Sequence, residues 1–143
     1  MAVDWNKYVG LPFKHLGLDP KTGIDCLNLV RLIYKEELNI EFPYTTRDWC
    51  DVISQNWYDS THIDPFKKGA VAEYGWESIK EPELFSVITM YMGTSTITNH
   101  CALYIGDNKI LHIFIGHRSH IATYGKYYKQ YTMGVYKWIG LSS

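Results

Sequence analysis

The sequence predicts an α+β fold in which helices come first and an antiparallel sheet follows. Two observations support this prediction. Apolar residues recur at helical spacing after residue 25, whereas the second half contains runs of β-branched and aromatic residues separated by turn signals. At 143 residues, with 46% hydrophobic residues, a single domain spanning residues 1–143 is expected.

The first half is organised around a helix expected from about residue 25 to residue 38. Its apolar residues show the three-and-four spacing of a buried helical face, and Asp25 is placed to cap the first turn. Residues 2–10 read as a short helix, and a loop leads from there to the main helix. Residues 45–58 again show a helical pattern, and residues 59–82 are expected to form an irregular insert with short helical pieces.

The second half reads as a series of strands. Gly106-Asp107-Asn108 is the strongest hairpin signal in the chain. The run from residue 124 to residue 131 is compatible with either a short helix or an aromatic loop. The expected strands cover residues 85–92, 100–105, 109–115, 119–123 and 133–139.

Cys26 is placed where the main helix begins. Unpaired backbone N–H groups and the positive end of the helix dipole favour an anion there, so the thiol should ionise more readily than a free cysteine with a pKa of about 8.5. A lone cysteine on a helix is also often a small buried hydrophobe. A catalytic role therefore requires a base from elsewhere in the chain.

Two histidines of the hairpin are candidates for that base and its partner. If Asp107-Asn108 alone forms the loop, Leu103 pairs with His112 and the histidines take opposite faces of the sheet. A three-residue loop, or an equivalent bulge, pairs Ala102 with His112 and makes His100 its diagonal neighbour on the same face. We predict the second register. Cys26, His100 and His112 are then nominated as nucleophile, base and orienting residue.

Composition and charge exclude several classes of function. The net charge is −1 and no long run of one sign occurs, which argues against nucleic-acid binding. No stretch has the form of a signal peptide or the roughly twenty apolar residues of a membrane span, so synthesis in the cytoplasm without membrane insertion is expected. The spacing of Cys26, Cys50 and Cys101 matches no zinc motif, so we expect reduced thiols and no metal site.

Several motifs together resemble the NlpC-type cysteine peptidases, which have a papain-like fold. They are Gly10-Leu11-Pro12-Phe13, the run Gly23-Ile24-Asp25-Cys26-Leu27-Asn28, the run from His100 to Gly106, and His112. The resemblance is closest to the bacteriophage tail-assembly branch, whose final strand the run from Tyr131 to Trp138 resembles. It implies a nucleophile helix packed on an antiparallel sheet and a hydrolase, or thiol protease, that cuts peptide stems of bacterial peptidoglycan without a cofactor.

By this resemblance, Cys26, His100 and His112 form the catalytic triad, and Phe13, Asp25 and Leu27 lie in the substrate or oxyanion vicinity. The phage branch implies a virion tail protein that takes part in cell wall degradation at the host envelope, with other tail proteins as possible partners. The family often has Tyr at the position of Phe13 and Ser-Gly in place of Leu27-Asn28. These departures are also consistent with a second hypothesis, in which the chain is a structural tail-assembly protein that keeps the fold but does not hydrolyse peptides.

For several residues outside the candidate site we expect a structural role. Cys50 and Cys101 are expected to pack in the core, with Cys101 pointing away from His100. His117 and His120 are expected in a solvated loop just after a strand. The tyrosines between residues 124 and 131 form an amphipathic patch, which is expected to pack against the sheet and could alternatively serve as a protein interface.

Overall fold

The computed structural model describes residues 2–42, 75–91 and 100–140, and the following account is confined to them. In chain order the elements are the 3₁₀ helix η1 (Trp5–Tyr8), β1 (Leu18–Asp19), β2 (Gly23–Ile24), α1 (Cys26–Leu38), β3 (Trp76–Ser78), β4 (Val87–Met90), β5 (His100–Gly106), β6 (Lys109–His112), β7 (His120–Thr123), α4 (Lys126–Lys129) and β8 (Thr132–Trp138). The predicted order of helices first and sheet second is confirmed.

Helix α1 begins and ends where the sequence indicates. The Asp25 carboxylate accepts a hydrogen bond from the backbone N–H of Asn28 at 2.8 Å, which satisfies one of the free donors of the first turn. At the other end, Asn39 adopts a left-handed conformation with φ 55° and closes the helix. Cys26 is therefore the first residue of the helix, as predicted.

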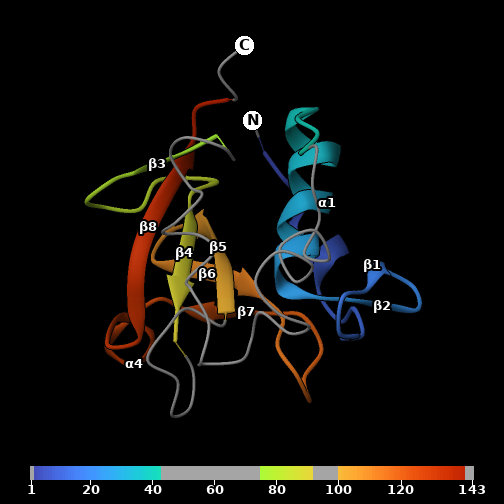
Figure 1. Ribbon diagram of the computed structural model, residues 1–143. Coiled ribbons are helices and arrows are strands. Elements are labelled where there is room, and N and C mark those ends of the chain that lie inside the picture. Colours follow the sequence, from blue (N-terminus) through green and yellow to red (C-terminus); the bar gives the residue numbers. More distant parts are fainter. Residues whose placement is uncertain (1, 43–74, 92–99, 141–143) are drawn as a thin grey trace.

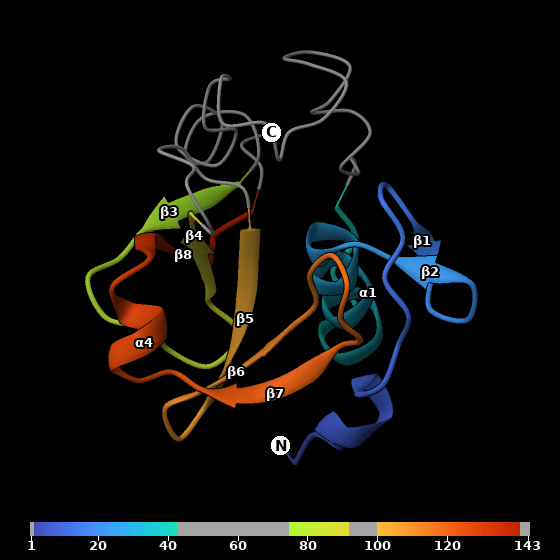
Figure 2. The same ribbon diagram turned by 90° about the horizontal axis from the view of Figure 1, so that it is seen from below.

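Six strands form one antiparallel sheet in the order β3-β8-β4-β5-β6-β7. Helix α1 packs against one face, while the short helix α4 lies on the opposite side of β5 (Figure 1 and Figure 2). β1 and β2 form a separate two-stranded sheet immediately before α1. The sheet thus separates the molecule into two layers of side chains.

Alternation along the central strands divides the buried residues between these layers. Val87, Cys101 and Leu103 pack with the apolar face of α1, whereas Ile88 and Ala102 pack on the other side against residues around α4. The α1 side holds the larger cluster. Its buried members on the helix are Cys26, Leu27, Leu29, Val30, Ile33 and Tyr34.

The hairpin between β5 and β6 shows the predicted register, reached through a bulge. Leu103 pairs with Leu111 and Tyr104 with Ile110, and the register then shifts so that Gly106 pairs with Lys109. Asp107 and Asn108 form a two-residue turn with φ of 52° and 57°, as a type I′ turn requires. The extra residue of the bulge restores the register that places His100 and His112 on one face, so this prediction is confirmed.

Some expected elements differ from the observed ones. The first helix is shorter than residues 2–10 because Val9 is already extended. Trp76–Ser78 forms strand β3 within the expected irregular insert, since it pairs with β8, an element about 60 residues later that local reasoning did not consider. The predicted helix at residues 45–58 lies outside the described residues. No helix in the described part of the chain is long and apolar enough to cross a membrane.

Candidate active site

The first component of the site is the thiol of Cys26. β2 delivers the chain to the N-terminus of α1, and Asp25 fixes the start of the helix. The neighbouring Asn28 side chain donates to the carbonyl of Gly17 at 2.9 Å, which ties the preceding loop to the helix. The Cys26 side chain is almost fully enclosed, at 2% exposure. The sequence therefore holds a thiol at the positive end of the helix dipole.

The second component is a pair of buried histidines on neighbouring strands. His100 is the first residue of β5, and His112 is the last residue of β6. The Nε2 atom of His100 lies 2.9 Å from the Nδ1 atom of His112, which is hydrogen-bond distance. The predicted contact between the two imidazoles is thus present.

The Cys26 thiol forms a hydrogen bond with His100 of the histidine pair. Burial by itself raises the pKa of the Cys26 thiol, but hydrogen bonds from the Cys101 side chain and from His100, and then the charge of His100, lower it. The net result is a pKa well below that of a free thiol. Since the Nε2 atom of His100 is taken by His112, the nitrogen left for Cys26 is Nδ1. The three side chains can therefore form a thiolate–imidazolium pair with a third group behind it.

Cys101 has a more specific position than sequence reasoning expected. It is fully buried in the core on the α1 side, as predicted for a residue that alternates with His100. Its thiol is also in hydrogen-bond contact with Cys26. Burial raises the pKa of Cys101, and the negative charge of Cys26 raises it further, so Cys101 stays protonated and donates to the Cys26 sulfur.

His112 is held in its neutral form. Burial lowers its pKa to about 2, and the nearby His100, His120 and His117 lower it in the same direction. A neutral imidazole has one protonated and one unprotonated nitrogen. His112 is therefore suited to orient His100 by a hydrogen bond and not to act as a second charged group.

The three other nominated residues lie on the segments next to the nucleophile. Phe13 forms a parallel bridge with Ile24, two residues before Cys26, and packs partly against the α1 core. Asp25 is buried and caps the helix. Leu27 points into the core with 1% exposure. Its side chain is thus part of the packing of α1.

Sequence reasoning missed His120. The sequence predicts a solvated loop at this residue, but it opens β7 and pairs in register with His112. Its Nε2 atom lies 3.0 Å from the Nε2 atom of His112. The expected short strand at residues 119–123 was the available signal, because a strand paired with β6 brings His120 beside His112. The described residues contain no group of three His, Cys, Asp or Glu side chains arranged to hold a metal ion.

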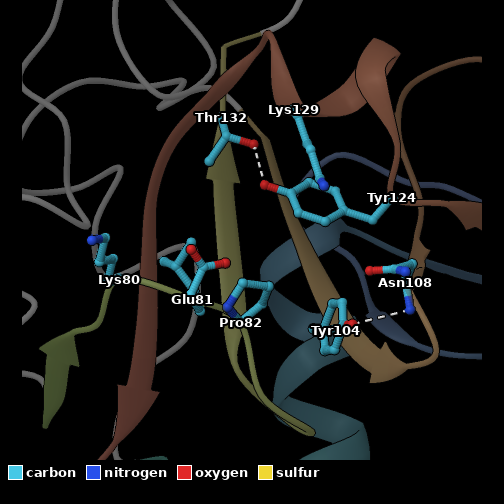
Figure 3. Close-up of a pocket in the computed structure, with 9 residues that line it drawn as sticks. Lys80, Glu81, Pro82, Tyr104, Asn108, Tyr124, Lys129 and Thr132 are labelled. Atoms are coloured by element: carbon cyan, nitrogen blue, oxygen red, sulfur yellow. Dashed lines mark hydrogen bonds between the residues drawn. The ribbon is translucent and has the colours of Figure 1, made fainter.

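Tyr124, Tyr128 and Tyr131 pack against the sheet, as one interpretation of the patch predicted, whereas Tyr127 is 56% exposed. The Tyr124 hydroxyl bonds Thr132 at 2.7 Å, and the Tyr128 ring meets the His112 ring edge-on with centroids 5.1 Å apart. Tyr124, Tyr104 and Lys129 also line a cavity of about 600 Å³ (Figure 3). This cavity contains none of the three nominated catalytic residues and is separate from the candidate site.

Comparisons with known proteins identify a family and a fold. The sequence model of the NlpC/P60 family matches residues 10–137. Comparison with curated protein sequences found no match. Among solved structures, the NlpC/p60 domain of the peptidoglycan hydrolase SagA is similar at a TM-score of 0.56 and 16% identity, covering 92% of this chain and 91% of that one.

Two further structures show the same fold. An NlpC/P60 family protein from Bacillus cereus ATCC 10987 has a TM-score of 0.62 and 18% identity, with 94% of this chain and 38% of that chain covered. NlpC1 from Trichomonas vaginalis has a TM-score of 0.59 and 15% identity, with 92% and 41% covered. The chain thus spans less than half the length of these two proteins. The fold predicted from the resemblance is confirmed.

Proposed function

The chain belongs to the NlpC/P60 family, and from this premise we propose that it is a cysteine peptidase that hydrolyses peptide stems of bacterial peptidoglycan. Cys26 is the nucleophile, His100 the base and His112 the orienting residue. One observation supports these roles most strongly. A thiol at a helix N-terminus contacts an imidazole that is itself hydrogen-bonded to a second, neutral imidazole.

The chemistry follows from the proton positions. The Cys26 thiolate attacks the carbonyl carbon of the scissile amide and forms a carbon–sulfur bond. As the carbon–nitrogen bond breaks, the His100 imidazolium gives its proton to the leaving amine. A water molecule then attacks the thioester while His100 takes a proton from it, and the Cys26 sulfur leaves. His112 keeps the His100 ring in place throughout, and no cofactor is required.

The substrate class rests on family membership and on the neighbours. SagA, similar over nearly the whole length of the chain, is described as a peptidoglycan hydrolase. Peptide stems of peptidoglycan are therefore the first substrates to test. The low pKa of Cys26 supports acyl transfer at neutral pH, where a free thiol would be largely protonated.

The direct test is hydrolysis of purified peptidoglycan and of synthetic stem peptides, with products identified by mass spectrometry. We expect the wild-type chain to release peptide fragments and Cys26→Ala to release none, because removing a nucleophile costs many orders of magnitude in rate. His15→Gln is the control, since it replaces an exposed histidine that is not one of the three proposed catalytic residues. Cleavage by a folded Cys26→Ala variant would refute the assignment.

The narrower proposal is that the protein acts as a bacteriophage tail component at the host envelope. It rests on the sequence resemblance to the tail-assembly branch alone. Detection of the chain in purified virions by mass spectrometry would support it, and its absence from them would contradict it.

The same fold without hydrolysis is the second candidate function. Two observations favour it: Cys26 is only 2% exposed, and Phe13 lacks the hydroxyl that the family often has at this position. Under this alternative the folded wild-type chain cleaves no stem peptide, and its Cys26 reacts like an ordinary buried thiol.

A further inference from the structure

A third histidine extends the pair behind Cys26 into a row. His120 is the strand partner of His112, and their rings lie 4.5 Å apart between centroids. The Nε2 atoms of the two residues are 3.0 Å apart. On its other side, the Nδ1 atom of His120 lies 2.9 Å from the backbone carbonyl oxygen of Arg118. The row therefore runs from a carbonyl group through three imidazoles to the thiol.

The carbonyl group of Arg118 sets the direction of the hydrogen bonds in this row when His120 carries a single hydrogen. A carbonyl oxygen only accepts, so the Nδ1 atom of His120 must carry a hydrogen. When this is the only hydrogen on the ring, the Nε2 atom of His120 is an acceptor, and His112 donates to it from its own Nε2. Since buried His112 is neutral, its Nδ1 is unprotonated and accepts from the Nε2 atom of His100. With its one hydrogen on Nε2, His100 has an unprotonated Nδ1 atom that can accept the proton of Cys26.

The reverse proton order is unproductive. It would require His120 to carry hydrogens on both nitrogens and hence a positive charge. His112 would then donate from Nδ1 to His100, so the Nε2 atom of His100 would have to remain an acceptor. Under that order His100 has a hydrogen on Nδ1 already and cannot take the Cys26 proton without losing its bond to His112. The bond to the carbonyl of Arg118 is satisfied by a single hydrogen on Nδ1 of His120, whereas the reverse order needs a second hydrogen on this ring.

The segment that presents this carbonyl is anchored to the N-terminal part of the chain. The buried hydroxyl of Ser119 donates to the carbonyl of Tyr8 at 2.6 Å and accepts from the backbone N–H of Leu11 at 2.8 Å. The Arg118 guanidinium donates to the carbonyl of Gly10 at 2.9 Å. These bonds hold the Arg118 carbonyl and the start of β7 in one position, so the direction of the hydrogen bonds is built into the fold.

We infer that His120 is a positioning residue that sets the tautomer of His112, and through it the tautomer of His100. The unprotonated Nδ1 atom of His100 then faces Cys26. The effect of His120 on catalysis rests on the proposed function, but the proton order does not. Among the described residues, the titratable or charged groups near the row include His117, with its ring 6.3 Å from that of His120, the Arg118 side chain, and Tyr128, which contacts His112. The three imidazoles are in direct hydrogen-bond contact with one another, His100 with His112 and His112 with His120.

The first test reads the proton order directly. Long-range ¹H–¹⁵N correlation spectra of histidine-labelled full-length Cys26→Ser, at neutral pH, distinguish the two tautomers of each imidazole. We expect hydrogen on Nδ1 of His120, on Nε2 of His112 and on Nε2 of His100. Hydrogen on Nδ1 of His112 in this protein would overturn the inference, whatever the activity of the wild type.

The second test uses two substitutions at position 120. His120→Phe keeps a ring against Phe114 and His112 but removes the acceptor, whereas His120→Gln retains an acceptor oxygen for the His112 Nε2–H group. Loss of an outer partner of a working histidine typically costs about 10- to 100-fold, as measured for metal-bound histidines. We expect Cys26 alkylation at neutral pH to slow by about that factor in His120→Phe and to stay close to wild type in His120→Gln.

The outcomes separate the inference from the proposed function. Equal slowing in both variants, or none in a folded His120→Phe, would overturn the positioning role. If wild-type Cys26 reacts like an ordinary thiol while His112 carries its hydrogen on Nε2, the proton order stands and the peptidase assignment fails. If His120→Phe does not fold, the spectrum of Cys26→Ser still decides the inference.

Discussion

The neutral, buried state of His112 predicts a specific loss of stability in acid. Its side chain is 1% exposed, and burial together with neighbouring histidines lowers its pKa to about 2. In the unfolded chain a histidine takes up a proton near pH 6.5. Between these two values the unfolded state binds one more proton than the folded state, so the free energy of unfolding falls as the pH falls.

The magnitude follows from linkage. Each pH unit in this window removes about 1.4 kcal/mol of stability through this one group. From pH 7 to pH 4.5 the loss assigned to His112 is therefore about 2.5 kcal/mol. His112→Gln retains a polar side chain that does not titrate. The free energy of unfolding of this variant should therefore lack the pH dependence due to His112 and keep the pH dependence due to the other groups.

The measurement is urea unfolding of both proteins, followed by tryptophan fluorescence at several pH values between 7 and 4.5. His112→Gln is expected to be less stable than wild type at pH 7, because buried hydrogen bonds are lost, and the gap should narrow by about 2.5 kcal/mol at pH 4.5. If the difference in the free energy of unfolding between the two proteins stayed constant from pH 7 to pH 4.5, a neutral His112 in the folded state would be refuted.

Three further predictions concern helix α1. Asp25→Ala should lower the free energy of unfolding by about 1 kcal/mol in thermal or urea unfolding because the N-cap is lost, and Asp25→Asn, which also caps, should stay closer to wild type. Asn39→Ala should cost about 1 kcal/mol because φ is 55° at this position, whereas Asn39→Gly should equal or exceed wild-type stability. Ile33 is fully buried, so Ile33→Ala should cost about 2–5 kcal/mol and Ile33→Val about 0.5–1.5 kcal/mol in the same assays. An Asp25→Asn variant as unstable as Asp25→Ala, an Asn39→Gly variant less stable than Asn39→Ala, or a neutral Ile33→Ala would contradict the respective argument.

Local sequence signals were sufficient for the parts of the site that depend on neighbours along the chain. Apolar spacing and the Asp25 cap place Cys26 at the start of α1. The turn at Asp107-Asn108, with its bulge, places His100 and His112 on one face. Each of these features depends on residues within a few turns or one hairpin, where propensity and alternation decide the structure.

The remaining features depend on contacts between distant elements. β3 exists because Trp76 to Ser78 find a partner in β8, and Cys101 meets Cys26 because α1 packs on β5. His120 joins the site only through the pairing of β7 with β6. Neither turn signals nor alternation within one strand specify which elements become neighbours. The hairpin register and the resemblance both nominated roles for Cys26, His100 and His112, and neither nominated His120.

The measurement that most directly tests the account is the rate of Cys26 alkylation as a function of pH, read at the Cys26 peptide by mass spectrometry, in wild type and in His100→Ala. A thiolate stabilised by His100 predicts rapid alkylation with an apparent pKa well below that of a free thiol, and loss of this reactivity in His100→Ala. A wild-type rate that rises only near the pKa of a free thiol, and that is unchanged in His100→Ala, would contradict the proposed catalytic site.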